Sequence, residues 1–242
     1  MRILKSFFII ACLFFFSGCT QTRQKITIGL DPLFPTQNFD EKQNDVYGYF
    51  SELLLMISKM ERVDFEIVEH NEALLKENLL KEKYDMMVSF MKPYNFNRSQ
   101  FSLSEIFLQT GPVLIIRKDD SYKKIEDFEN AKVGCLSEEA VLYLQSFPDI
   151  MIQQYDFASK LLQDLVKKNI DAALLGRLAA ASYVKNIFFT SLKMIDRPLI
   201  DEGMRFVSLK KNNHKIRFLD KILSKPIMKK NMLKLQEKWN LI

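Results

Sequence analysis

Residues 25–30 read KITIGL, residues 50–60 read FSELLLMISKM, and residues 63–68 read VDFEIV. The first and third stretches alternate apolar and polar side chains, as half-buried strands do, whereas the second has an apolar face at helical spacing. A helical stretch at residues 72–81 and the apolar stretch DMMVSF at residues 85–90 continue the alternation. This order of strands and helices predicts an α/β fold, with a mainly parallel sheet covered by helices on both faces.

The same alternation recurs in the middle of the chain. It begins with GPVLIIRK at residues 111–118 and continues to a helical stretch at residues 178–185. A late strand-like stretch, MRFVSL at residues 204–209, precedes two helical stretches at residues 215–224 and 229–239. We therefore expect two α/β units, and no long linker interrupts the chain.

The N-terminus is typical of an export signal. Residues 1–19 read MRILKSFFIIACLFFFSGC: a basic start, an apolar stretch too short to span a bilayer, and small residues before a cysteine. The FSGC sequence resembles the lipobox of bacterial lipoproteins, which implies removal of residues 1–18, lipid on Cys19, and a short tether at residues 19–24. An ordinary cleaved signal with an incidental cysteine is the alternative. Lipidation would anchor the protein to a membrane outside the cytoplasm.

The charge of the chain does not indicate nucleic-acid binding. The chain has 35 Lys and Arg against 30 Asp and Glu, and losing Arg2 and Lys5 with the signal leaves 33 against 30. The resulting charge of about +3 is spread among mixed signs, and export itself argues against a nucleic-acid partner. A hydrophobic content of 48% is ample for packed cores.

Cysteine and histidine usage excludes several kinds of site. Cys12 leaves with the signal and Cys19 would carry lipid, so Cys135 has no partner for a disulfide within the chain. Its apolar surroundings predict a buried, inert thiol. His70 and His214 are far apart, and no metal-ligand spacing occurs. The sequence predicts no metal and no cofactor, and it lacks the GxSxG, phosphate-loop and HExxH motifs.

The order of short motifs resembles family 3 of the extracellular solute-binding proteins, the receptors of polar amino-acid ABC importers. No single motif is specific, but their order and spacing match over nearly the whole exported chain. The matching segments are KITIGLDPLFP (25–35), YGYFSELLLMISKM (47–60), LLKEKYDMMVSF (79–90), LSEIF (103–107), GPVLIIRKDDSYKKIEDFENAKVG (111–134), NIDAALLGR (169–177) and LQEKWNLI (235–242).

The resemblance implies a periplasmic-binding-protein (Venus flytrap) fold, in which two α/β lobes enclose a ligand cleft. The first lobe would be discontinuous, formed by residues 25–110 and 203–242, and the second would be formed by residues 111–202. The two connecting segments would lie near residues 109–114 and 200–204. Gly111 and Gly203 would absorb backbone rotation there as the lobes close.

A cleft for a zwitterion needs donors for the carboxylate, an acceptor for the ammonium and a surface for the side chain. In the family an aromatic residue of the first loop stacks on the ligand. Phe34 fits that place, with Phe39 second, and a place in the core is the alternative for each. Asp31 either accepts from a cationic end of the ligand or caps the loop. Ser89 and Phe90, at the end of a strand, are placed to offer backbone groups.

The family's carboxylate clamp is an arginine preceded by a threonine. An alignment without gaps puts Asn97 at the arginine position, and Arg98 follows one residue later. Tyr94 stands at the threonine position. We expect Arg98 to reach the site through a local loop shift, and a surface arginine is the alternative.

The second lobe departs further from the family pattern. Ser137 with Glu138 replaces its Gly-Thr/Ser turn, and Gly176 followed by Arg177 replaces its ammonium-binding aspartate. Glu138 either takes over as acceptor or only favours the start of a helix. A buried, unpaired ammonium costs several kcal/mol, so we do not expect the usual clamp to operate.

Two accounts of the ligand remain open. Either the contacts to an amino acid are rebuilt, or the ligand differs. Tyr94, Arg98 and Arg177 together would suit a more anionic ligand.

The resemblance implies a monomeric, lipid-anchored protein of the periplasm or cell envelope with no catalytic residues. It would capture a small polar solute, an amino acid or a related compound, and deliver it to an ABC permease after lobe closure. A sensor or docking lipoprotein with a degenerate cleft is one alternative. A dehydratase-like enzyme that uses Glu138 or Asp31 as acid or base is the less favoured one.

Overall fold

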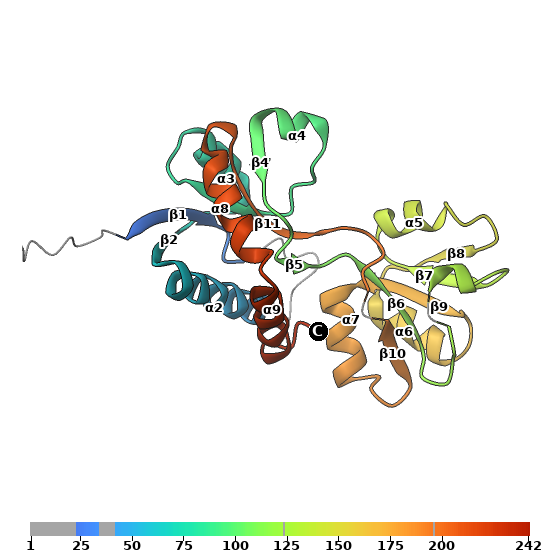
Figure 1. The fold of residues 1–242 in the computed structure, drawn as a ribbon. Helices are drawn as coiled ribbons and strands as arrows, with labels where there is room; N and C mark the ends of the chain where they lie inside the picture. Colours follow the sequence, from blue (N-terminus) through green and yellow to red (C-terminus); the bar gives the residue numbers. More distant parts are fainter. Residues whose placement is uncertain (1–22, 34–41, 123, 196) are drawn as a thin grey trace, which may run out of the picture.

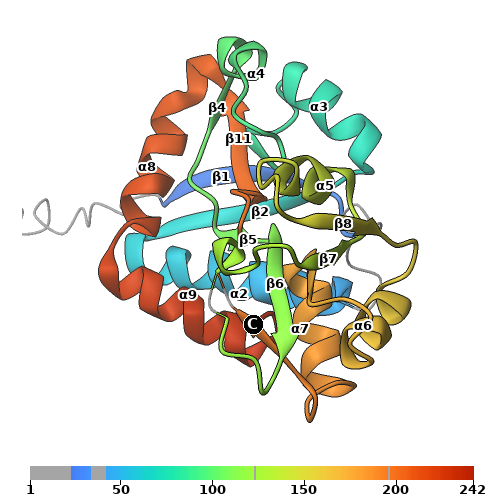
Figure 2. The ribbon, with the colours of Figure 1, turned by 90° about the vertical axis from the view of Figure 1, so that its right-hand side faces the viewer.

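The computed structural model describes residues 23–33, 42–122, 124–195 and 197–242. The described chain forms two lobes, each built on a β-sheet with helices packed against it, and extended segments connect the lobes (Figure 1). Figure 2 looks along the molecule from the side of the second lobe. The mixed α/β, two-lobe fold that the motif order implies is confirmed.

The first lobe contains the six-stranded sheet, with the strand order β2-β1-β3-β11-β4 and β5 paired to β11. Its strands are β1 (Gln24–Leu30), β2 (Val63–Glu69), β3 (Met86–Ser89), β4 (Phe101–Leu103), β5 (Leu108–Gln109) and β11 (Gly203–Leu209). Its helices are α2 (Gln43–Glu61), α3 (Glu72–Leu80), α4 (Asn95–Gln100), α8 (Asn213–Leu223) and α9 (Pro226–Lys238), with the 3₁₀ turn η4 (Lys210–Asn212) before α8.

The second lobe contains the five-stranded sheet, with the strand order β10-β6-β9-β7-β8. Its strands are β6 (Pro112–Arg117), β7 (Lys132–Cys135), β8 (Met151–Gln154), β9 (Ala172–Gly176) and β10 (Leu192–Ile195). Its helices are α5 (Glu138–Leu144), α6 (Ala158–Val166) and α7 (Arg177–Asn186), with the 3₁₀ turn η3 (Ile125–Asp127) after β6.

Both sheets are mixed rather than mainly parallel. β1 is parallel to β2 and β3, and β7 is parallel to β8 and β9, as the strand–helix alternation predicts. β11 instead runs antiparallel to β3, β4 and β5, and β6 runs antiparallel to β9 and β10. These two strands enter their sheets from the other lobe, so no covering helix on the same sheet sets their direction.

Large apolar side chains fill the first lobe where the matching motifs meet. Tyr49 and Phe50 of α2 are fully buried, and the Tyr49 hydroxyl donates to the Phe107 carbonyl over 2.7 Å. Gly48 lies against the Trp239 ring, where an added Cβ would come within 2.2 Å. The YGYF segment of α2 and the KW segment at the end of α9 therefore pack against each other and are not ligand contacts.

One property expected from the sequence, a buried Cys135, is confirmed in the described chain. Cys135 is a free, buried cysteine, and burial raises the pKa of its thiol, as expected of an inert side chain. No described helix is long and apolar enough to cross a membrane.

The two connecting segments lie against each other between the lobes. The backbone N–H groups of Thr110 and Gly111 both donate to the Glu202 carbonyl, over 2.9 and 3.2 Å. A Cβ on Gly111 would lie 2.2 Å from the Ile200 carbonyl oxygen, and one on Gly203 would lie 2.2 Å from that of Leu108. No described glycine has a positive φ, so these two glycines serve close backbone approach.

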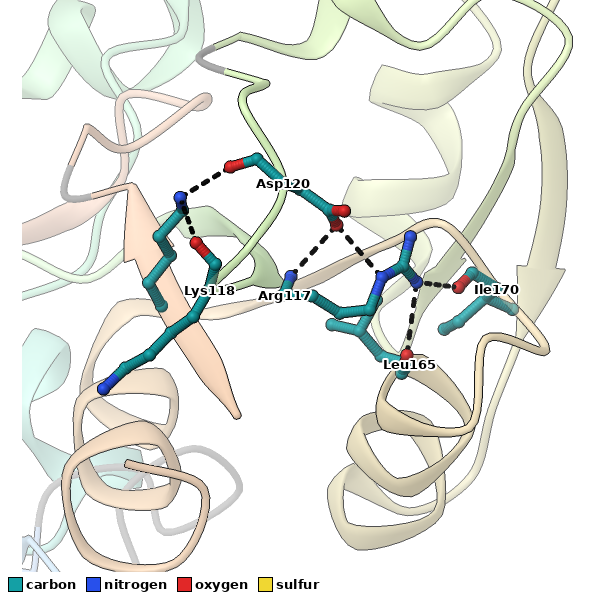
Figure 3. A network of polar contacts seen from close by, with 6 residues as sticks. Arg117, Lys118, Asp120, Leu165 and Ile170 are labelled. Carbon is teal, nitrogen blue, oxygen red and sulfur yellow. Dashed lines mark hydrogen bonds and ion pairs between the residues drawn. The ribbon is translucent and has the colours of Figure 1, made fainter. Parts of the chain in front are cut away.

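A polar network fixes the end of β6 in the second lobe (Figure 3). The Arg117 Nη1 donates to the carbonyls of Leu165 and Ile170, over 3.2 and 2.9 Å. The Arg117 Nε lies 3.1 Å from Asp120 Oδ2, which also accepts from the Arg117 backbone N–H. The guanidinium thereby connects the end of β6 to the last turn of α6 and to the segment that follows it.

Candidate functional site

A cavity of about 620 Å³ lies between the lobes. Its walls come from α3 and the segments before α2 and after β3 in the first lobe, from both connecting segments, and from β6, β9 and helices α5 to α7 in the second lobe. Phe90, Leu136, Leu174, Leu175 and Leu178 are among the apolar residues that line it. The volume suits a ligand of amino-acid size, with room for water.

Lys92 forms an ion pair in the wall of the cavity. Its Nζ lies 2.5 Å from Glu202 Oε1, with the two side chains 35% and 23% exposed. Burial alone would lower the Lys92 pKa, but the hydrogen bond and charge of Glu202 outweigh it, and the charge of Glu139 adds to the effect, so the pKa is raised. The ammonium is charged, and Glu139 faces it from the second lobe.

Two further charged residues line the first-lobe side. Lys42 is buried, and its Nζ donates to Asp45 Oδ2 over 2.9 Å at the start of α2. Glu72 opens α3, where an acidic side chain suits the helix dipole. The backbone N–H of Glu72 donates to Asp31 Oδ2 over 2.6 Å, while Asp31 Oδ1 accepts from Leu33 N–H over 2.9 Å. Asp31 therefore does not line the cavity but fixes Glu72, which does.

Ser89 and Phe90, the two residues expected at the end of a strand, have different roles. Ser89 Oγ accepts from the Met91 backbone N–H over 3.1 Å, which shapes the turn after β3. Phe90, between these residues, lines the cavity.

On the second lobe, Ser137 and not Glu138 lines the cavity. Ser137 is the N-cap of α5, and its Oγ accepts from Ala140 N–H over 3.2 Å. Glu138 is exposed outside the lining, whereas its neighbour Glu139 is part of it. One residue rotates a helical side chain by about 100°, which separates the two carboxylates.

The structure does not bring Tyr94, Arg98 and Arg177 together. Tyr94 is 53% exposed and stacks on Phe96 at 5.6 Å between ring centroids. Arg98 is exposed, its Nε donates to the Pro93 carbonyl over 2.8 Å, and it lines a second cavity. Arg177 is only 5% exposed, and its Nη1 donates to Gln236 Oε1 over 3.3 Å. Arg177 thus connects α7 of the second lobe to α9 of the first.

Three residues named from the sequence, Phe34, Phe39 and Cys19, lie outside the described residues. Sequence reasoning missed five charged residues of the lining: Lys42, Glu72, Lys92, Glu139 and Glu202. Lys92 and Glu202 lie beside the expected strand end and the expected second connection, so a search for charges next to these boundaries would have found them. Nothing in the sequence pattern singles out Lys42 or Glu72.

Comparison with known sequences gives one family. The sequence profile of bacterial extracellular solute-binding proteins, family 3, matches residues 26–242. The arginine-binding extracellular protein ArtP of Bacillus subtilis is 20% identical over 238 residues, covering 97% of this chain and 93% of that protein.

Solved structures share the fold at low identity. The L-cystine solute receptor of Neisseria gonorrhoeae, in an unliganded open conformation, superposes with a TM-score of 0.72 at 18% identity, covering 90% of this chain and 93% of the receptor. An ancestral cyclohexadienyl dehydratase superposes with a TM-score of 0.68 at 15% identity, covering 90% of this chain and 93% of that one.

Proposed function

Because the chain belongs to family 3 of the bacterial extracellular solute-binding proteins, we propose that it captures an amino acid between its lobes for an ABC importer. The observation that carries this proposal is the Lys92–Glu202 ion pair in the wall of the interlobe cavity, with Glu139 opposite. An ammonium flanked by carboxylates has the two charges that a zwitterion needs. The α-carboxylate of the ligand would take Lys92, and its α-ammonium would take Glu202 and Glu139.

The charge of the cavity favours a basic amino acid. Its described lining contains two lysines, Lys42 and Lys92, against three glutamates, Glu72, Glu139 and Glu202. Two positive and three negative charges leave one carboxylate in excess, and Lys42 is already paired with Asp45. The excess carboxylate would receive a cationic side chain, and the arginine-binding relative supports this choice.

Binding would close the lobes. We assign residues 25–110 and 203–242 to the first lobe and residues 111–202 to the second. Lys92 and Glu72 belong to the first part, and Ser137 and Glu139 to the second, so a ligand that contacts both sets shifts the population toward the closed form.

The protein would work as a monomer attached to the cell envelope by lipid on Cys19. A Cys19→Ser variant should then appear in the soluble extracytoplasmic fraction, and the wild type in the membrane fraction. Equal distribution of the two would contradict the anchor and leave the binding proposal untouched.

A thermal-shift panel tests the binding function. The full chain, purified in detergent, is heated with L-arginine, L-glutamine or L-glutamate. A ligand at a hundredfold over its dissociation constant adds about 2.7 kcal/mol to the unfolding free energy, which raises the Tm by several degrees. L-arginine should give the largest shift, and Lys92→Met and Glu202→Gln should each reduce it.

The remaining outcomes separate the alternatives. No shift with any amino acid would contradict the proposal and favour a sensor or docking role. Conversion of the bound compound, seen by mass spectrometry of the incubated mixture, would favour a dehydratase-like enzyme.

A further inference from the structure

A second cavity, of about 590 Å³, lies within the first lobe. Its walls come from Pro93 and α4, from β4 and the segment after it, from β5 and Asp201, and from β11, η4 and α8. None of the described residues lines both this cavity and the interlobe cavity. It also borders the connecting segments, because Gln109 and Asp201 both line it and the Gln109 Nε2 donates to Asp201 Oδ1 over 3.1 Å.

Arg205 of β11 lines this cavity with most of its hydrogen-bonding capacity unused. The side chain is 7% exposed, and its Nη1 makes one long hydrogen bond, 3.5 Å, to the Ser104 carbonyl. Its Nε is buried and has no partner among the described residues, and it forms no ion pair with a described carboxylate. A buried donor without a partner costs about 1–3 kcal/mol, so an acceptor in the cavity would relieve a standing penalty.

Two further cationic residues line the cavity with Arg205. Arg98 and Lys210 also line the cavity, and the Lys210 Nζ donates to the Arg98 carbonyl over 3.1 Å. Burial lowers the Arg205 pKa and the charge of Arg98 adds to this effect, while Asp201 and Asp220 oppose it. Two arginines that repel each other across one cavity favour an anion between them, because a carboxylate matches the planar fork of a guanidinium.

The acidic side chains of the lining limit the charge of that anion. Asp201 accepts from Gln109, and Asp220 Oδ1 accepts from the Glu105 backbone N–H over 2.8 Å. With Glu105, three acids face the three cations Arg98, Arg205 and Lys210. Because these charges cancel, each negative charge on a ligand adds repulsion from the acids, so one charge is favoured over two.

Gln109 requires a hydrogen-bond donor on the ligand. Its Oε1 is buried without a partner among the described residues, and the bond from its Nε2 to Asp201 fixes the orientation of the amide. We propose that this cavity binds a small monocarboxylate with a neighbouring hydroxyl or amine, its carboxylate held between the guanidinium groups of Arg205 and Arg98.

Glycolate is the probe, because it has both groups and, unlike glycine, is not an α-amino acid that the interlobe cavity would take. The full chain in detergent is melted with increasing sodium glycolate, sodium acetate, sodium phosphate or sodium chloride at constant ionic strength. Glycolate should raise the Tm saturably, acetate less, and chloride not at all. Arg205→Gln and Arg98→Gln should each weaken glycolate roughly tenfold, the effect of losing one charge-assisted bond.

Matched controls make the result decisive. Arg217→Gln removes a charge from an exposed residue of α8 outside the lining and should leave glycolate binding unchanged. Lys92→Met, in the other cavity, should also leave it unchanged. If Arg205→Gln does not fold, Arg98→Gln decides, because Arg98 is exposed.

Three results would overturn the proposal. The first is a glycolate effect no larger than that of chloride. The second is an effect that both arginine variants retain or that Lys92→Met abolishes. The third is stronger stabilisation by phosphate than by glycolate, which would refute a singly charged ligand.

Discussion

Arg117 in the second lobe and Arg205 in the first occupy comparable places but differ in how well their guanidinium groups are hydrogen-bonded. Each lies on a strand that enters its sheet from the other lobe, β6 or β11, and each is mostly buried. Arg117 bonds two carbonyls and a carboxylate at 2.9 to 3.2 Å, as Figure 3 shows. Arg205 makes one bond of 3.5 Å.

The difference separates an arginine that completes the fold from one that is available to a ligand. The carbonyls of Leu165, in the last turn of α6, and of Ile170, in the segment that follows, both accept from Arg117. No helix end of this kind supplies carbonyls to Arg205. Lys92 lies between these cases, because a ligand carboxylate can replace Glu202, its ion-pair partner among the described residues.

Arg117→Met should have the largest effect. It removes two hydrogen bonds to the Leu165 and Ile170 carbonyls and the ion pair with Asp120, so the free energy of unfolding should fall by about 3 kcal/mol. Urea denaturation of the variant and the wild type measures the loss. A loss under about 1 kcal/mol would show that Arg117 is no more structural than Arg205.

Lys92→Met should act on ligand binding. Removing the ammonium leaves the ligand carboxylate without its charged donor, and the affinity for the amino acid should fall at least thirtyfold, about 2 kcal/mol. Equilibrium dialysis with labelled L-arginine measures it, with the exposed Lys221→Met as the control. Unchanged affinity would place the carboxylate elsewhere in the cleft.

Asp85→Asn tests whether a charged residue of the first lobe other than Arg205 is stabilised by its partners. Burial alone would raise the Asp85 pKa, but Lys215 and the Thr27 N–H outweigh it and lower the pKa. A lowered pKa gives stability that is present above the ordinary carboxyl pKa and is lost as pH falls through the lowered value.

The variant should therefore be less stable than the wild type by about 1 kcal/mol at neutral pH. The difference should shrink below about pH 4. Urea midpoints across a pH series measure this, and a difference that grows in acid would contradict the sign.

Arg205→Met should have the smallest effect on stability. It removes a buried charge with few bonds, so the free energy of unfolding without added carboxylate should stay within about 1 kcal/mol of the wild type. Urea denaturation in chloride buffer, beside Arg117→Met, makes the comparison direct. A loss as large as that of Arg117→Met would mean that Arg205 has structural partners.

The sequence predicts most of the fold because the periodicity of side chains is local. The stretches at residues 25–30, 63–68 and 85–90 became β1, β2 and β3. The short α4, β4, β5 and β10 were not predicted, because elements of this length carry too little periodicity. The antiparallel direction of β6 and β11 depends on pairing with strands that are distant in the sequence, which no local pattern records.

The site was harder to predict, because it depends on single rotations and on long-range packing. Glu139 and Glu138 are neighbours in sequence, yet only Glu139 lines the interlobe cavity. Arg98 lies six residues after Lys92, and the turn into α4 places it in the second cavity instead of the first. Arg177 follows β9 as expected but faces α9.

The most direct test of the central claim is calorimetric titration of the full chain with L-arginine, with L-citrulline, a neutral isostere, and with L-glutamate. The account predicts saturable L-arginine binding at one site in the wild type, at least about tenfold weaker binding of L-citrulline, and loss of L-arginine binding in Lys92→Met. Tighter binding of L-glutamate than of L-arginine, or L-arginine binding that persists in Lys92→Met, would contradict it.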